Sequence, residues 1–141
     1  MIVYLIRHAS AGHRVNWEGD DDLRPLDERG RRQADGIVEL LGRREFRRIA
    51  SSPAVRCVDT VVPLAHARGL AVEHSEGLAE GAGTEAALTL FRGAGVPLVV
   101  SVHGDLIQEL LGERTKKGST TVLDVGRDGL EVLEHLPPPQ A

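Results

Sequence analysis

The clearest structural signal in the chain is the segment Ile2-Val3-Tyr4-Leu5-Ile6-Arg7-His8, in which an apolar run ends abruptly at two basic side chains. A strand that is covered on both faces need not alternate between apolar and polar residues. We therefore predict a buried strand over residues 2–6, with Arg7 and His8 at its carboxyl end.

Beyond this strand, short apolar runs alternate with segments of helical periodicity. Strands are predicted at 48–51, 70–74 and 97–102, and helices at 28–41, after Pro53 as far as Gly69, at 85–91 and around 106–111. Such alternation is typical of a parallel sheet with helices on both faces. Two further apolar segments, 120–125 and 130–134, flank a Gly-rich turn and predict a hairpin. The predicted fold is α/β, a three-layer α/β/α sandwich with a mainly parallel sheet and an antiparallel edge hairpin.

The length of 141 residues is that of one ordinary domain. We predict a single domain over residues 1–136 and a loose Pro-rich tail over 137–141.

A net charge of −4 gives no general electrostatic reason to bind nucleic acid or a membrane surface. The single cysteine, Cys57, cannot form an internal disulfide, and residues 1–6 are too short for a signal peptide or membrane span. We expect a cytoplasmic protein.

Reactive side chains follow three of the predicted strands. In open α/β sheets, ligands bind beyond the carboxyl ends of the strands. Arg7 and His8 follow the first strand, the segment 51–56 follows the second, and His103 with Gly104 follows the strand at 97–102. These three places are therefore expected to meet at one site.

The residue types at this site suit phosphoryl transfer. Histidine accepts a phosphoryl group when one ring nitrogen is free and a hydrogen bond fixes the other. The equatorial oxygens of the transferring group need positioned donors, which the planar guanidinium supplies best. Arg7, Arg56 and His103 would provide these donors, and Gly104 would add a backbone N–H if it opens a helix. No metal or other cofactor is needed for this chemistry.

The leaving group requires a proton, and Glu80 lies in a predicted loop that places it as the general acid. Glu76 and Glu85 are rivals for this role. If Glu80 is misplaced, activity toward phosphoramidates is favoured, because a basic nitrogen leaving group depends less on a strong acid.

A metal site is the alternative interpretation of six histidines. None of them has the His-x-x-x-His spacing that zinc sites commonly use, and there is no Cys-x-x-Cys pair. Cys57 is expected to be a packed thiol rather than a nucleophile.

Four segments resemble the histidine phosphatase (phosphoglycerate mutase-like) superfamily. They are Ile6-Arg7-His8-Ala9-Ser10, Leu23-Arg24-Pro25-Leu26-Asp27-Glu28-Arg29-Gly30, Ser51-Ser52-Pro53-Ala54-Val55-Arg56-Cys57-Val58-Asp59-Thr60 and Ser101-Val102-His103-Gly104. The short chain is similar to the compact subgroup that contains phosphohistidine phosphatases. The segments 19–21 and 117–120 also resemble the histidine phosphatase domain that is fused to some Nudix hydrolases.

The resemblance implies roles for individual residues. His8 matches the phosphorylated nucleophile, Arg7, Arg56 and His103 match the phosphate pocket, and Glu80 matches the proton donor. Asn16 is assigned as a further pocket residue. Ala9 departs from the usual glycine, which the fold tolerates if the backbone φ there is negative.

We therefore expect a metal-independent phosphatase that hydrolyses phosphomonoesters or phosphohistidine through a phospho-His8 intermediate. Its partner would be a phosphorylated small molecule or a phosphohistidine protein. For a nucleotide, only Trp17 near the site offers a stacking surface. The alternative is a catalytically weak phosphate-binding or regulatory module of the same fold. The sequence leaves open whether the segment 9–27 is a lid.

Overall fold

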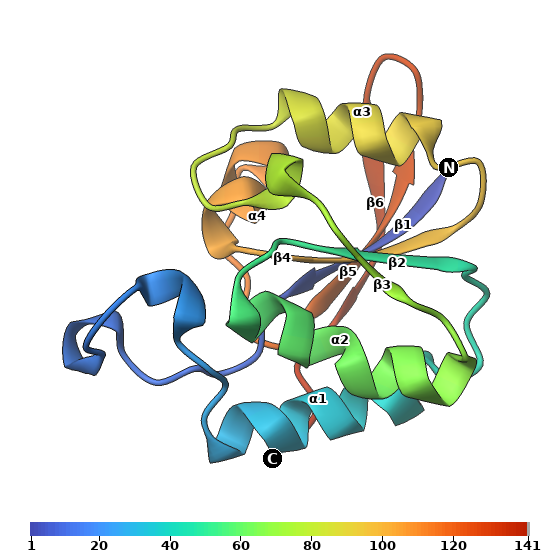
Figure 1. Ribbon diagram of the computed structural model, residues 1–141. Coiled ribbons are helices and arrows are strands. Elements are labelled where there is room, and N and C mark those ends of the chain that lie inside the picture. The colour runs from blue at the N-terminus through green and yellow to red at the C-terminus, as the bar shows by residue number, and fades with distance from the viewer. Residues whose placement is uncertain (141) are drawn as a thin grey trace.

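The computed structural model describes residues 1–140, which form a central sheet between two pairs of helices (Figure 1). The strands are β1 (Ile2–Arg7), β2 (Arg48–Ser51), β3 (Val72–His74), β4 (Leu98–Val102), β5 (Thr120–Val125) and β6 (Leu130–Leu136). The helices are α1 (Glu28–Leu41), α2 (Val55–Arg68), α3 (Glu85–Gly93) and α4 (Gly104–Leu111). Three 3₁₀ turns, η1 (Arg14–Asn16), η2 (Asp21–Leu23) and η3 (Glu76–Leu78), lie in the connections.

The sheet has the strand order β3-β2-β4-β1-β5-β6. Neighbouring strands from β3 to β1 pair in parallel, whereas β5 is antiparallel to β1 and β6 is antiparallel to β5. The prediction of a mainly parallel sheet with an antiparallel edge hairpin is confirmed.

Side chains of β1 alternate between two cores. Val3 and Leu5 face the core under α3 and α4, which includes Phe91, whereas Tyr4 and Ile6 face the core over α1 and α2. Because both faces are covered, the strand is apolar along its whole length. Figure 1 shows α3 and α4 on one side of the sheet and α1 and α2 on the other, which confirms the three layers.

The connection between β1 and α1 is more ordered than the plain loop expected from its polar sequence, because it contains η1 and η2. It projects from the body of the molecule beside the start of α1 (Figure 1). Asp27 caps α1 by accepting from the Gly30 backbone N–H at 2.7 Å, and it also accepts from Ser10 Oγ at 2.7 Å and the Gly12 N–H at 2.9 Å. One carboxylate thus joins the helix to the connection.

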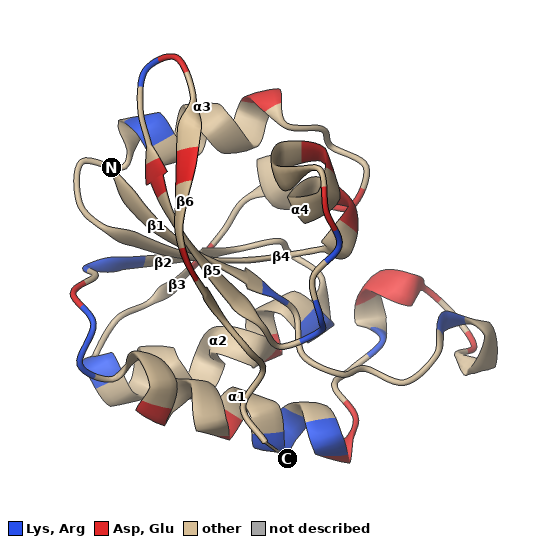
Figure 2. Ribbon diagram, turned by 180° about the vertical axis from the view of Figure 1, so that it is seen from behind, with Lys and Arg blue, Asp and Glu red and all other residues tan. Residues whose placement is uncertain are grey.

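The residues after β6 have no regular secondary structure as far as Gln140. Pro139 lies against α1 at Gly36, where an added Cβ would clash with the proline ring. Figure 2 shows this end of the chain beside basic positions at the start of α1. That residues 1–136 form the domain and that residues 137–141 form a loose tail are therefore still predictions. Within residues 1–140, no helix has both the length and the apolarity that crossing a bilayer demands.

Candidate active site

The carboxyl ends of β1, β2 and β4 bring His8, Ser52 and His103 to one place. The His8 N–H donates to the Val102 carbonyl at 2.9 Å, and the Ser52 N–H donates to the Ser101 carbonyl at 3.0 Å. The rings of His8 and His103 lie edge to face, with centroids 5.8 Å apart. The sheet itself therefore sets the spacing of the two histidines.

His8 is held in one tautomer. Its Nδ1 lies 2.8 Å from the Ala9 carbonyl, which can only accept, so Nδ1 carries the proton and Nε2 presents a lone pair. Burial lowers the pKa of His8, the Ala9 carbonyl opposes this shift, and the charges of Arg56 and Arg7 lower the pKa further, to about 3. His8 is therefore neutral at physiological pH, as a nucleophile must be.

The Ala9 carbonyl is itself oriented by neighbouring groups. The Ala9 N–H donates to Thr60 Oγ1 at 2.9 Å, and this hydroxyl donates to the Arg56 carbonyl at 2.7 Å. Throughout residues 1–140, positive φ angles occur only at glycines, so Ala9 has a negative φ. The expectation that the backbone tolerates alanine at this position is confirmed.

Arg56 lies in the first turn of α2 and is 0% exposed. A cation there opposes the helix dipole and needs an anion nearby. Asp21 supplies it, since Arg56 Nη2 lies 3.1 Å from Asp21 Oδ2 and Nη1 donates to the Asp21 carbonyl at 2.8 Å. Nη2 also lies 3.4 Å from His103 Nδ1, while Nε is buried with no acceptor among residues 1–140.

Arg7 lies across the start of α4. Its Nη1 donates to the Thr115 carbonyl, and its Nε is buried without an acceptor in the described part of the chain. A Cβ at Gly104 would lie 2.9 Å from Arg7 Nε, so the guanidinium occupies the space that only a glycine leaves. Burial and the charge of Arg114 lower the pKa of Arg7. In both guanidinium groups at the site, the Nε–H donor therefore lacks an acceptor within residues 1–140.

His103 is the residue that precedes α4. Its Nε2 is hydrogen bonded to Ser52 Oγ at 2.8 Å, and burial, followed by the charge of Arg56, lowers its pKa. Cys57 Sγ lies 3.6 Å from the same nitrogen. Burial raises the pKa of this thiol to about 12, so Cys57 is a packed thiol, as the sequence predicts.

The structure places Glu80 at the site. Glu80 Oε2 lies 3.7 Å from His103 Nδ1 and 3.6 Å from Arg56 Nη2. Both carboxylate oxygens accept from Arg14 Nη2, at 2.9 and 2.8 Å, so Arg14 occupies both oxygens of Glu80 in this arrangement. The rivals Glu76 and Glu85 are exposed and do not line the cavity.

Asn16 does not join these groups. It lies exposed at the end of η1 and lines a separate hollow beside Trp17. Arg14, at the start of the same turn, reaches the site instead. Arg14 and Asn16 lie at opposite ends of the three-residue 3₁₀ turn and line different hollows, and counting along the sequence cannot show which of them lies in the cavity beside His8.

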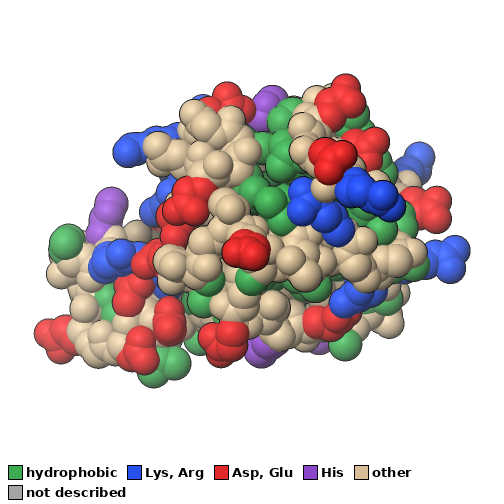
Figure 3. All heavy atoms as spheres, turned by 90° about the horizontal axis from the view of Figure 1, so that it is seen from above, with side chains coloured by type: hydrophobic (Ala, Val, Ile, Leu, Met, Phe, Trp, Pro, Cys, Tyr) green, Lys and Arg blue, Asp and Glu red, His purple; other side chains and the backbone are tan. Residues whose placement is uncertain are grey.

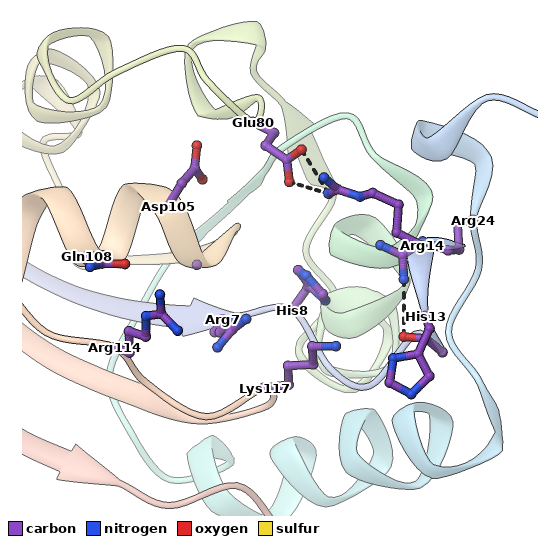
Figure 4. A pocket seen from close by; sticks show the side chains of 12 residues that line it. Arg7, His8, His13, Arg14, Arg24, Glu80, Asp105, Gln108, Arg114 and Lys117 are labelled. Carbon is purple, nitrogen blue, oxygen red and sulfur yellow. Dashed lines mark hydrogen bonds and ion pairs between the residues drawn. The ribbon is translucent and has the colours of Figure 1, made fainter. Parts of the chain in front are cut away.

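A cavity of about 420 Å³ opens beside His8. Figure 4 shows its basic side chains around the end of β1, with Arg114 on one side of Arg7 and Lys117 near His8. The cavity is lined by Arg7, His8, Gly12, His13, Arg14, Arg24, Glu80, Gly104, Asp105, Gln108, Arg114 and Lys117. Sequence reasoning did not find Arg14, Arg24, Arg114 and Lys117. Five cations and two carboxylates share this space in a chain of net charge −4.

The outer surface differs from the cavity. On the face over α3 and α4, acidic and basic side chains are interspersed (Figure 3). Within residues 1–140, no cluster of three or more His, Cys, Asp or Glu side chains has the arrangement of a metal site. The concentration of positive charge in the cavity therefore favours an anionic ligand.

Comparison with known proteins agrees with this geometry. Residues 3–90 match the sequence profile of the histidine phosphatase superfamily (branch 1), which is more than half of the chain. The chain belongs to the histidine phosphatase superfamily. An 8-oxo-(d)GTP phosphatase from Mycolicibacterium smegmatis is 33% identical over 156 residues, and the match covers 97% of this chain and 48% of the relative. The chain therefore spans about half the length of this curated relative.

Solved structures share the fold of this chain. A SixA protein from Agrobacterium tumefaciens, assigned as a phosphohistidine phosphatase, is 26% identical with a TM-score of 0.78, covering 97% of this chain and 98% of that one. A protein histidine phosphatase SixA complexed with tungstate is 20% identical with a TM-score of 0.75, covering 98% and 97%. The second likeness concerns the fold alone.

The superfamily match ends before α4, so it includes His8 and Arg56 but not His103. The sheet brings the remaining part of the site, His103, to the same place. β4 pairs with β1 in a register that aligns Arg7 with Val102, and this places His103 beside His8.

Proposed function

We propose that the protein is a phosphatase that transfers a phosphoryl group to His8 and then to water. The observation that carries this proposal is the tautomer of His8, in which Nδ1 donates to the Ala9 carbonyl and Nε2 is left free. Superfamily membership supports the same chemistry.

The reaction has two steps. His8 Nε2 attacks phosphorus, the bond from phosphorus to the leaving oxygen or nitrogen breaks, and the bonding electron pair departs with the leaving group. Water then attacks the phosphorus of phospho-His8, the P–N bond breaks, and inorganic phosphate leaves. Arg7 and Arg56 have donors that the equatorial oxygens of the transferring group would satisfy. His103 lies beside His8 and would contact the same phosphoryl group, and Gly104 opens α4, where a backbone N–H favours an anion.

The substrate is a phosphorylated small molecule or a phosphohistidine protein. Glu80 must leave Arg14 before it can protonate an alkoxide, whereas a phosphoramidate nitrogen takes up its proton more readily. This arrangement favours phosphoramidates over alkyl phosphomonoesters. Two similar proteins are named as a phosphohistidine phosphatase and an 8-oxo-(d)GTP phosphatase, and the substrates in both names have good leaving groups. Both therefore support this preference. A cytoplasmic location is part of the same proposal.

The test compares wild type, His8→Ala and His66→Ala in hydrolysis of p-nitrophenyl phosphate with EDTA present. His66 is exposed near the end of α2 and serves as the matched control. We expect turnover and an acid-labile phosphoenzyme in wild type and in His66→Ala, and neither in His8→Ala. If all three proteins bind phosphate but none turns over, the protein is the binding module of the alternative hypothesis.

A further inference from the structure

Two basic side chains in the cavity have no partner. Among residues 1–140, the side chains of Arg114 and Lys117 line the cavity and form no hydrogen bond or ion pair. The other arginines there are engaged: Arg7 with the Thr115 carbonyl, Arg14 with Glu80, and Arg24 with Asp21. The positive charges of Arg114 and Lys117 are therefore not neutralised by ion pairs within the described residues.

The segment that carries these two cations is fixed to the catalytic strand. The Gly118 N–H lies within hydrogen-bonding distance of the carbonyls of Arg7 and His8, at 3.0 and 3.2 Å, and the Arg7 N–H donates to the Ser119 carbonyl at 3.1 Å. Gly118 has a φ of +84°, and a Cβ there would lie 3.1 Å from Gln33. The turn therefore requires glycine, and it holds Lys117 and Arg114 at a set place relative to His8.

The two carboxylates of the cavity offset only part of this charge, and neither forms an ion pair with Arg114 or Lys117 within residues 1–140. Asp105 accepts from the Gly81 N–H at 2.8 Å and from the Leu106 N–H at 2.8 Å, and Glu80 is occupied by Arg14. Burial lowers the pKa of Lys117, and the charges of Arg7 and Arg24 lower it further. A bound anion would relieve this repulsion.

One phosphoryl group at His8 would engage Arg7 and Arg56. Figure 4 shows Arg114 on the side of Arg7 away from His8, next to Gln108. In-line transfer puts the leaving group opposite the attacking nitrogen. Because His8 and Arg114 line the same cavity, a leaving group that carries its own phosphate can reach Arg114 while the transferring phosphoryl group stays at His8.

We propose that Arg114, assisted by Lys117, forms a second anion subsite, and that the small-molecule substrates are diphosphate esters such as nucleoside diphosphates. This inference rests on the proposed function of His8. The terminal phosphorus bonds to His8 Nε2, the bond to the bridging oxygen breaks, and its electron pair stays on the inner phosphate, which leaves as a monoester. A phosphate leaving group needs less protonation than an alkoxide, which suits a Glu80 that is held by Arg14.

The test measures kcat and KM for ADP and for AMP, which differ by one phosphate, by release of inorganic phosphate. Wild type should prefer ADP. Arg114→Ala and Lys117→Met should each lower the ratio of the two kcat/KM values by ~10- to 100-fold, mainly through the KM for ADP, as expected for a lost charged hydrogen bond. Arg127→Ala, in the turn between β5 and β6, should keep the wild-type ratio.

Two results would overturn the inference and leave the proposed function standing. One is an unchanged ratio in Arg114→Ala. The other is a wild-type enzyme that hydrolyses AMP, p-nitrophenyl phosphate or a phosphohistidine protein through His8 but does not act on ADP. By contrast, failure to form a phosphoenzyme with any of these substrates would remove the proposed function itself.

Discussion

Gly104→Ala should slow catalysis without weakening the fold. A Cβ at this position would lie 2.9, 3.0 and 3.1 Å from Arg7 Nε, Cζ and Nη2, whereas ordinary contacts begin at 3.4 Å. The guanidinium must therefore move by about 0.5 Å, because Gly104 belongs to the backbone of α4. A displacement of about 1 Å can cost ~10²-fold in rate, so we expect kcat to fall by ~10-fold, or about 1.4 kcal/mol in activation free energy.

The fold should not suffer, because alanine is favoured over glycine in helices by up to about 1 kcal/mol. The assay pairs p-nitrophenyl phosphate hydrolysis with urea denaturation of the same samples. Gly93→Ala is the matched control, since it also lies in a helix and an added Cβ there meets no atom within 4 Å. Wild-type kcat in Gly104→Ala would refute the argument that Arg7 needs this space.

Three further predictions concern pH, helix capping and thiol reactivity. Because the pKa of His8 is lowered to about 3, the acid limb of kcat/KM should not lie at the ordinary histidine value near ~6.5. The folded pKa lies below the unfolded one, so stability falls as pH drops from ~6.5 toward 3, and urea denaturation of His8→Ala should show a shallower loss over that range. Asp27→Asn should keep the cap of α1 but lose the acceptor for Ser10 and Gly12, which should lower the free energy of unfolding by about 1–3 kcal/mol. Asp27→Ala also loses the cap and should lower it by about 1 kcal/mol more. Equal stability of wild type and both variants in urea would contradict this prediction. Burial raises the pKa of Asp27, but its hydrogen bonds lower it more, so this contribution is present above the unfolded pKa and is lost as pH falls through the folded one. Cys57, with its pKa raised to about 12, should resist iodoacetamide at pH 8 in the folded protein and react in urea, as followed by mass spectrometry; rapid labelling of the native form would show that the thiol is accessible.

The fold was predictable because its signals are local. The apolar run before Arg7 and the helical spacing after Glu28 each depend on residues close in sequence, and they correspond to β1 and α1. The connection from Ala9 to Asp27 was less predictable. Its turns are held by contacts such as that of Asp21 with Arg56, which are distant in sequence.

The site was predictable where a strand end carries it and unpredictable where a turn does. His8 and His103 follow strands, so topology alone brings them together. Arg14 and Lys117 lie in turns whose orientation depends on backbone contacts such as that of the Gly118 N–H. The pattern of residues does not encode these directions, and Asn16 was therefore chosen where Arg14 reaches the cavity.

Because β1 and β4 pair in a fixed parallel register, the geometry of the two histidines and the contacts with the rest of a substrate depend on different parts of the chain. The spacing of His8 from His103 belongs to the sheet, through the bond from the His8 N–H to the Val102 carbonyl. The side chains that would meet the rest of a substrate belong to the connections at 12–24 and 113–117. Substitutions in these connections can accumulate while the nucleophile keeps its geometry. This chain is therefore a suitable scaffold for retargeting by loop exchange, in which selectivity is rebuilt and the spacing of the two histidines is inherited, provided that the contacts of Asp21 with Arg56 and of Thr115 with Arg7 are kept.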